Sequence, residues 1–310
     1  MNERMKISEV EKEKNSIKKW RKIMIVFAVT ILLPIIYFSW LLISGNMQMS
    51  EDDDVTARFK LSRSMKSSYT NILQGSYDYN FAFCSDPHLT SEGDSVFPEL
   101  DAFIRANKTG FVVFGGDLTF LGLEAEYDNF ITNANKLTVP VYPAIGNHDL
   151  YNNGWNVYYR KLGPSVYSFY GGNAKFVVID SADSEIGDLQ MDWIRKELKE
   201  NQQPLLFVIS HVPMYGGNSL SLFPQNKEKE ELVALFEKYE VDIVFQGHYH
   251  GFADVTVNNV RYITCGSFSE TLLDSGFRQF ISVKVYGPEI KIEEVIVGKD
   301  LPIQYKNPVI

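Results

Sequence analysis

Cysteine and histidine are scarce in this chain of 310 residues. The two cysteines, Cys84 and Cys265, are too few for a disulfide-stabilised small scaffold or for a zinc site made of four thiolates. They could pair outside the cell, but both lie in apolar, strand-like runs where free buried thiols are common, so we interpret them as structural thiols. The five histidines all fall in a few short motifs, described below.

No class of residue is abundant enough for an extended or fibrous protein. Hydrophobic residues make up 45% of the chain and charged residues 22%, which is typical of a globular domain. These fractions exclude a disordered chain, a collagen-like fibre and a pure coiled coil. The mean hydropathy is slightly negative, which excludes a protein with many membrane spans.

The net charge of −9 is unevenly distributed along the chain. Residues 1–22 contain eight Lys and Arg against four Glu, and residues 23–44 contain no charged residue, so the remainder is strongly acidic. Proteins that track a nucleic-acid backbone need clustered Lys and Arg. We therefore expect no bulk nucleic-acid binding, although a nucleotide could still be a substrate.

Residues 23–44 form an uncharged, mostly apolar stretch of 22 residues. At 1.5 Å per residue such a helix is long enough to cross a hydrocarbon core of about 30 Å. A cleaved signal peptide and a buried core helix are the alternatives, but signal peptides have shorter apolar cores and end in small residues. The basic flank before the stretch and the acidic flank after it predict a single-pass signal-anchor in the cell membrane, with a cytoplasmic N-terminus and an extracytoplasmic body.

The sequence therefore predicts a cytoplasmic basic tail (1–22), a transmembrane helix (23–44), an irregular stalk or lead-in (45–77) and one domain (78–310). In this domain, short apolar runs alternate with stretches of helical period, which indicates an α/β fold with buried strands. The apolar runs are 79–84, 111–114, 139–145, 175–180, 204–210 and 241–246, and the helical stretches are 96–107, 123–137, 188–201 and 227–239. Four further runs, at 255–257, 261–265, 279–285 and 289–297, follow without helices and predict an antiparallel meander on the same core.

Polar residues with metal-ligand chemistry follow five of the strand-like runs. Because loops leaving the carboxyl ends of strands form the sites of open α/β sheets, we expect these residues to converge in one cleft. Each motif alone has an ordinary explanation as a turn or a buried histidine, but the whole set does not, so together they predict a metal site. The motifs are Asp86-x-His88, Gly116-Asp117, Gly146-Asn147-His148-Asp149, His211 and Gly247-His248-x-His250.

This ordered set of motifs resembles that of the calcineurin-like metallophosphoesterases, over about residues 79–270. The resemblance implies a four-layer double β-sandwich flanked by helices, and two metal ions in one centre. Asp86, His88 and His250 would hold one ion, Asn147, His211 and His248 would hold the other, and Asp117 would bridge both.

The resemblance also implies a reaction, which is the hydrolysis of phosphoesters. Imidazole and carboxylate ligands suit two divalent transition-metal ions such as Mn, Fe or Zn. A hydroxide shared by the ions would attack phosphorus in line. His148, left without an ion, would act as general acid or stabilise the transition state, with Asp149 as the carboxylate that orients it.

Two departures from the family pattern narrow the branch. Purple acid phosphatases carry a tyrosine ligand three residues after the bridging Asp, where this chain has Phe120, and their first motif lacks the histidine that His88 supplies. We therefore expect a phosphodiesterase-like protein of a bacterial, membrane-anchored kind. A phosphomonoesterase or nucleotidase with the same site, and a non-catalytic envelope scaffold, remain as alternatives. The oligomeric state is not predicted.

Two loops beside the expected cleft are candidates for substrate selection, although ordinary surface loops would have the same composition. Their candidate substrate-binding residues are Tyr151, Asn152, Tyr215 and Asn218.

Overall fold

The computed structural model of the chain describes residues 54–92, 97–269 and 278–298, the backbone of 301–306, and scattered positions between 18 and 36. The chain divides into two compact units, Met1–Gln48 and Met49–Ile310. In the part of the chain that the structure describes, no helix is both long and apolar enough to cross a membrane. The predicted span, 23–44, lies mostly outside the described residues.

The first of two six-stranded sheets has the order β12-β11-β10-β1-β2-β3. Strands β1, β2 and β3 are parallel, whereas β10 to β12 form an antiparallel group joined to β1. In the register, Phe81 of β1 lies opposite Val283 of β10, and Phe83 lies opposite Val113 of β2. The bounds are β1 Asp78–Cys84, β2 Val112–Phe114, β3 Val141–Pro143, β10 Arg278–Tyr286, β11 Glu289–Gly298 and β12 Leu301–Lys306.

The second sheet has the order β4-β5-β6-β7-β9-β8. Its inner strands β5, β6, β7 and β9 are parallel, and β4 and β8 pair antiparallel at the two edges. All residues of β5, β6 and β7 are buried, as expected for parallel strands covered on both faces. The bounds are β4 Tyr167–Gly171, β5 Ala174–Val178, β6 Leu205–Ile209, β7 Ile243–Gln246, β8 Ala253–Val257 and β9 Val260–Thr264.

An aromatic core joins the two sheets face to face. Phe81 of the first sheet packs on Phe245 and Phe176 of the second, with ring centroids 5.7 and 5.3 Å apart. A second apolar cluster lies under α4 (Phe97–Asn107), α5 (Glu124–Ala134) and α6 (Gly154–Lys161) on the outer face of the first sheet. A third lies under α7 (Asp188–Lys199) and α8 (Lys227–Lys238) on the second. Helix, sheet, sheet and helix therefore form four layers, which confirms the predicted double sandwich.

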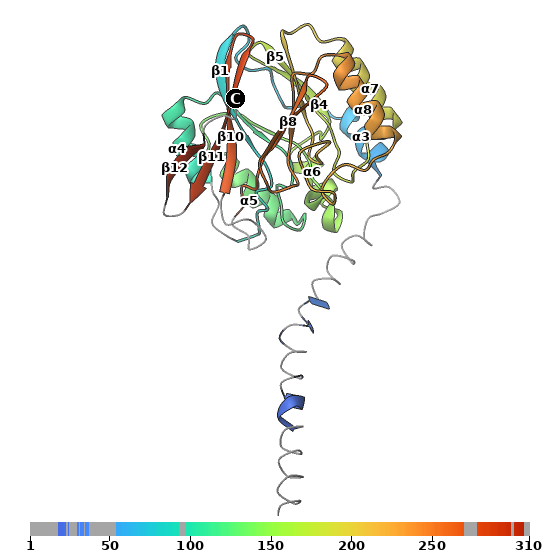
Figure 1. Ribbon diagram of the computed structural model, residues 1–310, viewed down its shortest axis with the longest axis vertical. Helices are drawn as coiled ribbons and strands as arrows, with labels where there is room; N and C mark the ends of the chain where they lie inside the picture. Colours follow the sequence, from blue (N-terminus) through green and yellow to red (C-terminus); the bar gives the residue numbers. More distant parts are fainter. Residues whose placement is uncertain are drawn as a thin grey trace, which may run out of the picture. The chain divides into compact units, whose positions relative to one another are not determined.

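Two expectations about the chain's organisation are wrong. The predicted antiparallel meander is divided, because β8 and β9 join the second sheet and β10 to β12 join the first. Within the predicted stalk, residues Val55–Ser64 form helix α3, whose Val55 and Phe59 are buried. In Figure 1, α3 lies beside α7 and α8, and it contacts α7 directly. The lead-in is thus part of the packed body from residue 54 onward.

Candidate metal centre

The predicted ligands all lie where strands end. Asp86 follows β1, Asp117 follows β2 and Asn147 follows β3 in the first sheet. His211 follows β6 and His248 follows β7 in the second. Because both sheets direct these carboxyl ends to one edge of the sandwich, residues from distant parts of the chain meet there.

Four side chains make up the first ligand group: Asp86, His88, Asp117 and His250, whose ligand atoms all lie within 4.8 Å of one another. His88 Nε2 lies 3.1 Å from His250 Nε2, and His250 Nε2 lies 3.3 Å from Asp86 Oδ1. His88 Nε2 lies 3.7 Å from Asp117 Oδ2. All but His250 are buried, so the group is open to solvent on the His250 side.

The second ligand group consists of Asp117, His211 and His248, with Asn147 beside it. His211 Nε2 lies 3.3 Å from Asp117 Oδ1 and 3.0 Å from Asn147 Oδ1. His211 Nδ1 donates to the carbonyl of Gly115, 2.8 Å away, which leaves Nε2 as the nitrogen that faces the group. Asp117 therefore belongs to both groups through different oxygens.

These residues fit a pair of transition-metal ions. Donor atoms bound to one such ion at about 2.0–2.1 Å lie roughly 3 Å from one another, and the closest pairs in the two groups lie 3.0–3.3 Å apart. Two buried carboxylates, four imidazoles and one carboxamide are a mixed nitrogen and oxygen set, which suits Mn, Fe or Zn better than Mg or Ca. The predicted division of ligands into two groups around Asp117 matches the geometry.

The backbone at the ligands is strained. Asp86, His88, Asp117, His248 and His250 all have positive φ, between 44° and 64°. Non-glycine residues adopt this left-handed region infrequently, and they do so mainly at turns and functional sites. Five of the thirteen non-glycine residues with positive φ in the described part of the chain are therefore candidate ligands.

Glycine is required just before Asp117, the carboxylate that the two ligand groups share. Gly116 has φ +102°, and a Cβ there would lie 2.6 Å from His211 Nδ1 and 2.9 Å from the backbone nitrogen of Gly146. A side chain at this position would push His211 away from the second ligand group. In the Gly-Asp motif, Asp117 is thus a candidate ligand, and Gly116 leaves room for the His211 ring.

Burial and neighbouring charges keep three of the ligands in the form that binds metal. Burial lowers the pKa of His88 to about 4, against the attraction of Asp117, and lowers the pKa of His248 to about 4 as well. Both imidazoles are therefore neutral at pH 7, which is the form that binds metal. Burial would raise the pKa of Asp86, but His250 and His211 outweigh it and lower the pKa to about 2.

His211 differs from the other two histidines. Burial would lower its pKa, but the carboxylates of Asp117 and Asp86 and the carbonyl of Gly115 raise the pKa to about 9. His211 correspondingly helps to hold the pKa of Asp117 well below its ordinary value, against the effect of burial. In the absence of metal, a proton on His211 thus takes the place of a cation in the second group.

His148 lies beside the centre and outside both ligand groups. Its ring centroid is 4.4 Å from that of His88, and its backbone nitrogen donates to Asp117 Oδ1 at 2.8 Å. Its Nδ1 donates to the carbonyl of Phe120 at 2.7 Å, which leaves Nε2 as the ring nitrogen that can contact a substrate. The predicted separation of His148 from the ligands therefore agrees with the geometry.

The prediction that Asp149 orients His148 is wrong. The Asp149 carboxylate accepts hydrogen bonds from the backbone nitrogens of Leu118, Thr119 and Gly146, at 3.2, 3.0 and 2.9 Å, and from the Thr119 hydroxyl at 2.8 Å. Burial, together with Asp117, raises its pKa to about 7. Asp149 thus joins the loop after β2 to the loop after β3, and the orienting acceptor is the Phe120 carbonyl. A backbone group carries no signal in the sequence, so it was missed.

Of the four candidate substrate residues, only Tyr151 faces the centre, with its ring centroid 4.9 Å from that of His148. Asn152 donates to the carbonyl of Leu121, and Asn218 caps its own turn by accepting from the backbone of residues 220 and 221. Tyr215 packs on Tyr262, with centroids 4.8 Å apart, and under the Lys229 ammonium. The side chains of Asn152, Tyr215 and Asn218 are therefore committed to local structure.

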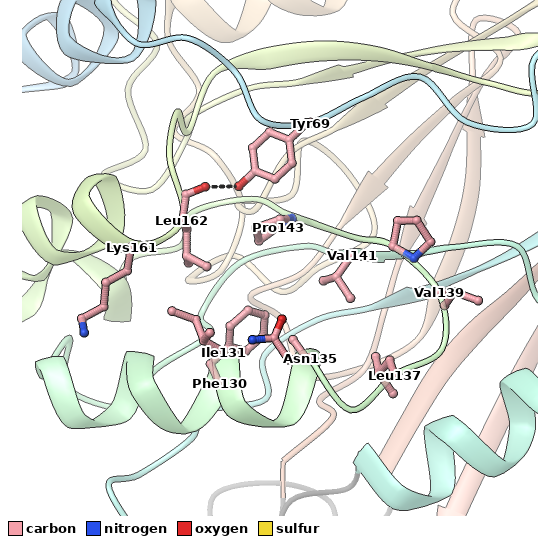
Figure 2. Close-up of a pocket in the computed structure, with 12 residues that line it drawn as sticks. Tyr69, Phe130, Ile131, Asn135, Leu137, Val139, Val141, Pro143, Lys161 and Leu162 are labelled. Carbon is pink, nitrogen blue, oxygen red and sulfur yellow. Dashed lines mark hydrogen bonds between the residues drawn. The ribbon is translucent and has the colours of Figure 1, made fainter.

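A cavity of about 330 Å³ lies elsewhere, between α5 and β3. Figure 2 shows its mostly apolar lining, including Phe130, Ile131 and Val141, with the hydroxyl of Tyr69 directed at the Leu162 carbonyl. It shares no residue with the two ligand groups, so it is separate from the candidate metal centre.

Solved structures share this fold at low sequence identity. A dimetal phosphatase from Danio rerio has a TM-score of 0.58 and 14% identity, covering 73% of this chain and 98% of that one. A protein described as the anchor in the inner membrane complex of Plasmodium also has a TM-score of 0.58, with 18% identity over 74% of this chain and 89% of that one. One fold thus occurs in a phosphatase and in an anchor, so the function must be argued from the site.

Curated relatives include two kinds of phosphoesterase. The Fe(3+)-Zn(2+) purple acid phosphatase 12 of Arabidopsis thaliana is 24% identical over 239 residues, 66% of this chain and 50% of that protein. A probable cyclic nucleotide phosphodiesterase of a Synechococcus species is 24% identical over 176 residues, 53% of this chain and 68% of that protein. Purple acid phosphatase 18 of Arabidopsis thaliana is 28% identical over 146 residues, 44% of this chain and 33% of its own length. The chain spans half or less of these two plant proteins.

The family model of the calcineurin-like phosphoesterases matches residues 79–252, which is more than half of the chain and includes every ligand of the two groups. The predicted resemblance is confirmed: the chain belongs to the calcineurin-like phosphoesterase family.

Proposed function

We propose that this protein is a metal-dependent phosphoester hydrolase that acts on phosphodiesters with two divalent transition-metal ions. The observation that carries the proposal is the pair of ligand groups joined by Asp117, at the carboxyl ends of strands from both sheets. A buried carboxylate shared between two sets of imidazoles has no role in packing, and it needs cations to balance it.

Each residue has a distinct role in the proposed reaction. Two ions bound by the ligand groups would supply a nucleophile at neutral pH and would neutralise the phosphoryl oxygens. Asp117 holds the two groups at a fixed separation, and the burial of His211 and Asp86 excludes water from the side opposite the substrate. His148, fixed by the Phe120 carbonyl, presents Nε2 to the leaving oxygen and donates a proton to it.

The substrate class can be decided directly. The probable phosphodiesterase relative and the residues His88 and Phe120 favour diesters, whereas the purple acid phosphatase relatives favour monoesters as the second candidate. The test compares turnover of bis(p-nitrophenyl) phosphate with that of p-nitrophenyl phosphate by the purified full-length chain in buffer containing Mn. Faster turnover of the diester supports the proposal, and faster turnover of the monoester supports the second candidate. Asp117→Asn is the control, since it should abolish turnover of both.

We also propose that the chain is anchored in the cell membrane through residues 23–44, with the catalytic body outside. The uncharged stretch and the opposite charges of its flanks support this arrangement. The substrate would then be an extracytoplasmic phosphoester.

A further inference from the structure

Helix α3 buries an arginine against the second sheet. Arg58 is fully buried, and it makes a two-pronged pair with Asp180, through Nε to Oδ2 at 2.9 Å and Nη2 to Oδ1 at 3.2 Å. Its Nη2 also lies 3.0 Å from Asp183 Oδ1. Ser165 donates to Asp180 Oδ2 at 3.2 Å, and the Tyr159 hydroxyl donates to the backbone carbonyl of Arg58 at 2.9 Å. The segment after β5 is thus held by a paired and hydrogen-bonded cluster.

The residue next to Asp180 contacts the candidate metal centre. The Ser181 hydroxyl accepts from the backbone nitrogens of His211 and Val212, each at 3.1 Å, and lies 3.0 Å from the Ser210 hydroxyl. Ser181 and these partners are buried. A continuous set of contacts therefore runs from Arg58 through the 180–181 segment to the backbone of His211.

We propose that Arg58 is a positioning residue for His211, and through it for the second metal ion. The inference rests on the proposed function, because it needs a centre that holds two ions. His211 Nε2 faces Asp117 and Asn147 only if its backbone keeps its place, and Ser181 supplies side-chain hydrogen bonds to that backbone. The first ligand group has no member in the loop after β6, so the second group should depend on Arg58 more strongly than the first.

The geometry requires arginine at this position. Two parallel hydrogen bonds to one carboxylate fix both the distance and the orientation of the 180–181 segment, which a single ammonium group cannot do. Partners outside the ligand shell change metal affinity by about 10–100-fold when they are removed. Because Arg58 acts through two intervening residues, we expect the lower end of this range.

The test titrates the metal-free, full-length chain with Mn²⁺ by calorimetry, and follows the formation of the coupled ion pair by electron paramagnetic resonance. We expect Arg58→Met, Arg58→Lys and Ser181→Ala to keep the first ion and to bind the second about tenfold more weakly. Excess Mn²⁺ should restore both the coupled signal and turnover. In the double variant of Arg58→Lys and Ser181→Ala, the fold-loss in affinity for the second ion should be smaller than the product of the two single fold-losses, because both substitutions act on His211.

Two matched variants on α3 control for damage to the fold. Ser62→Ala removes a buried hydroxyl that bonds to the backbone of Val166, and Arg63→Met removes a positive charge that lies over Trp193. No hydrogen bond or ion pair joins either side chain to the 180–181 segment in the described structure, so both variants should bind the second ion as the unmodified chain does. Their thermal stability is measured alongside that of the other variants.

Four outcomes would overturn the inference. The Arg58 and Ser181 variants could melt at lower temperature yet bind both ions normally, which would make Arg58 merely structural. The same variants could lose both ions equally. Alternatively, the α3 control variants could lose the second ion as well. In either case the weaker metal binding would not be specific to His211. An unmodified chain that binds no ion would instead overturn the proposed function, and the inference with it. If Arg58→Met fails to fold, Arg58→Lys and Ser181→Ala decide.

Discussion

Asp149 provides the most direct test of how the centre is built. In Asp149→Asn, an amide group replaces one of two oxygens that each accept two hydrogen bonds. In the less harmful orientation, the amide NH₂ group faces Thr119. The Thr119 hydroxyl can then rotate and accept a hydrogen bond from the amide, but the Thr119 backbone N–H loses its acceptor. The other orientation leaves the N–H groups of Leu118 and Gly146 without acceptors. A buried N–H left without an acceptor costs about 1–3 kcal/mol.

The expected loss in the free energy of unfolding is therefore at most about 1–3 kcal/mol, or roughly 2–12 °C in melting temperature for a domain of this size, because the substitution also removes a buried charge whose cost raises the pKa of Asp149 to about 7. Thermal denaturation of the full-length chain measures it. Asp128→Asn is the matched control, because Asp128 is exposed and its pairing with Lys161 should contribute less than about 1 kcal/mol. If Asp149→Asn leaves stability unchanged but slows turnover mainly for substrates with poor leaving groups, Asp149 acts on His148 after all, and its structural role is refuted.

Three further predictions concern catalysis, metal binding and topology. His148→Gln should keep both ions but slow turnover by about 10²–10⁴ for an alkyl phosphoester and by less for a p-nitrophenyl ester, whose leaving group needs little protonation; loss of metal, or equal slowing of both esters, would contradict this. Because the pKa of His211 is raised to about 9 while those of His88 and His248 are lowered to about 4, Mn²⁺ binding at pH 7.5 should release a proton from His211 in addition to the one from the water that becomes hydroxide, and affinity should rise with pH up to about 9. Calorimetry in buffers of different ionisation enthalpy counts the released protons, and release of no more than one would show that His211 is already neutral. Protease added to intact cells should digest residues 45–310, whereas digestion only after lysis would place the body inside.

The metal ligands could be predicted from the sequence because each follows an apolar run. Polar residues such as Asp117 and His211 have no packing role directly after a buried strand, and parallel strands bring such positions together. The same reasoning could not find the Phe120 carbonyl or Ser181, because backbone groups and single serines carry no distinguishing pattern. It also misassigned Asp149, since a neighbour in the sequence need not be a neighbour in hydrogen bonding.

Helix α3 was missed for a related physical reason. Its buried face consists of Val55, Arg58, Phe59 and Ser62, at the spacing of a helix, but two of the four are polar. A search for apolar periodicity therefore finds no helix there, although Arg58 is buried because Asp180 pairs with it. The division of the C-terminal strands between two sheets was also missed. Alternation of apolar and polar residues shows that one face of a strand is buried, but it does not show which strand is its neighbour in a sheet.

The strained backbone at the ligands shows how the chain sets the geometry of the centre. Each left-handed residue costs about 1–2 kcal/mol, and Asp86, His88 and Asp117 all adopt that conformation. The strain is held by hydrogen bonds between loops: the backbone nitrogens of Asp86 and His88 donate to the carbonyls of Gly116 and Asp117, and that of His248 donates to the Asp86 carboxylate. Each of these bonds joins a loop to the loop after another strand, so the ligand loops support one another. The chain's own contacts therefore position the ligands, and bound ions would stabilise an arrangement that the protein has already formed.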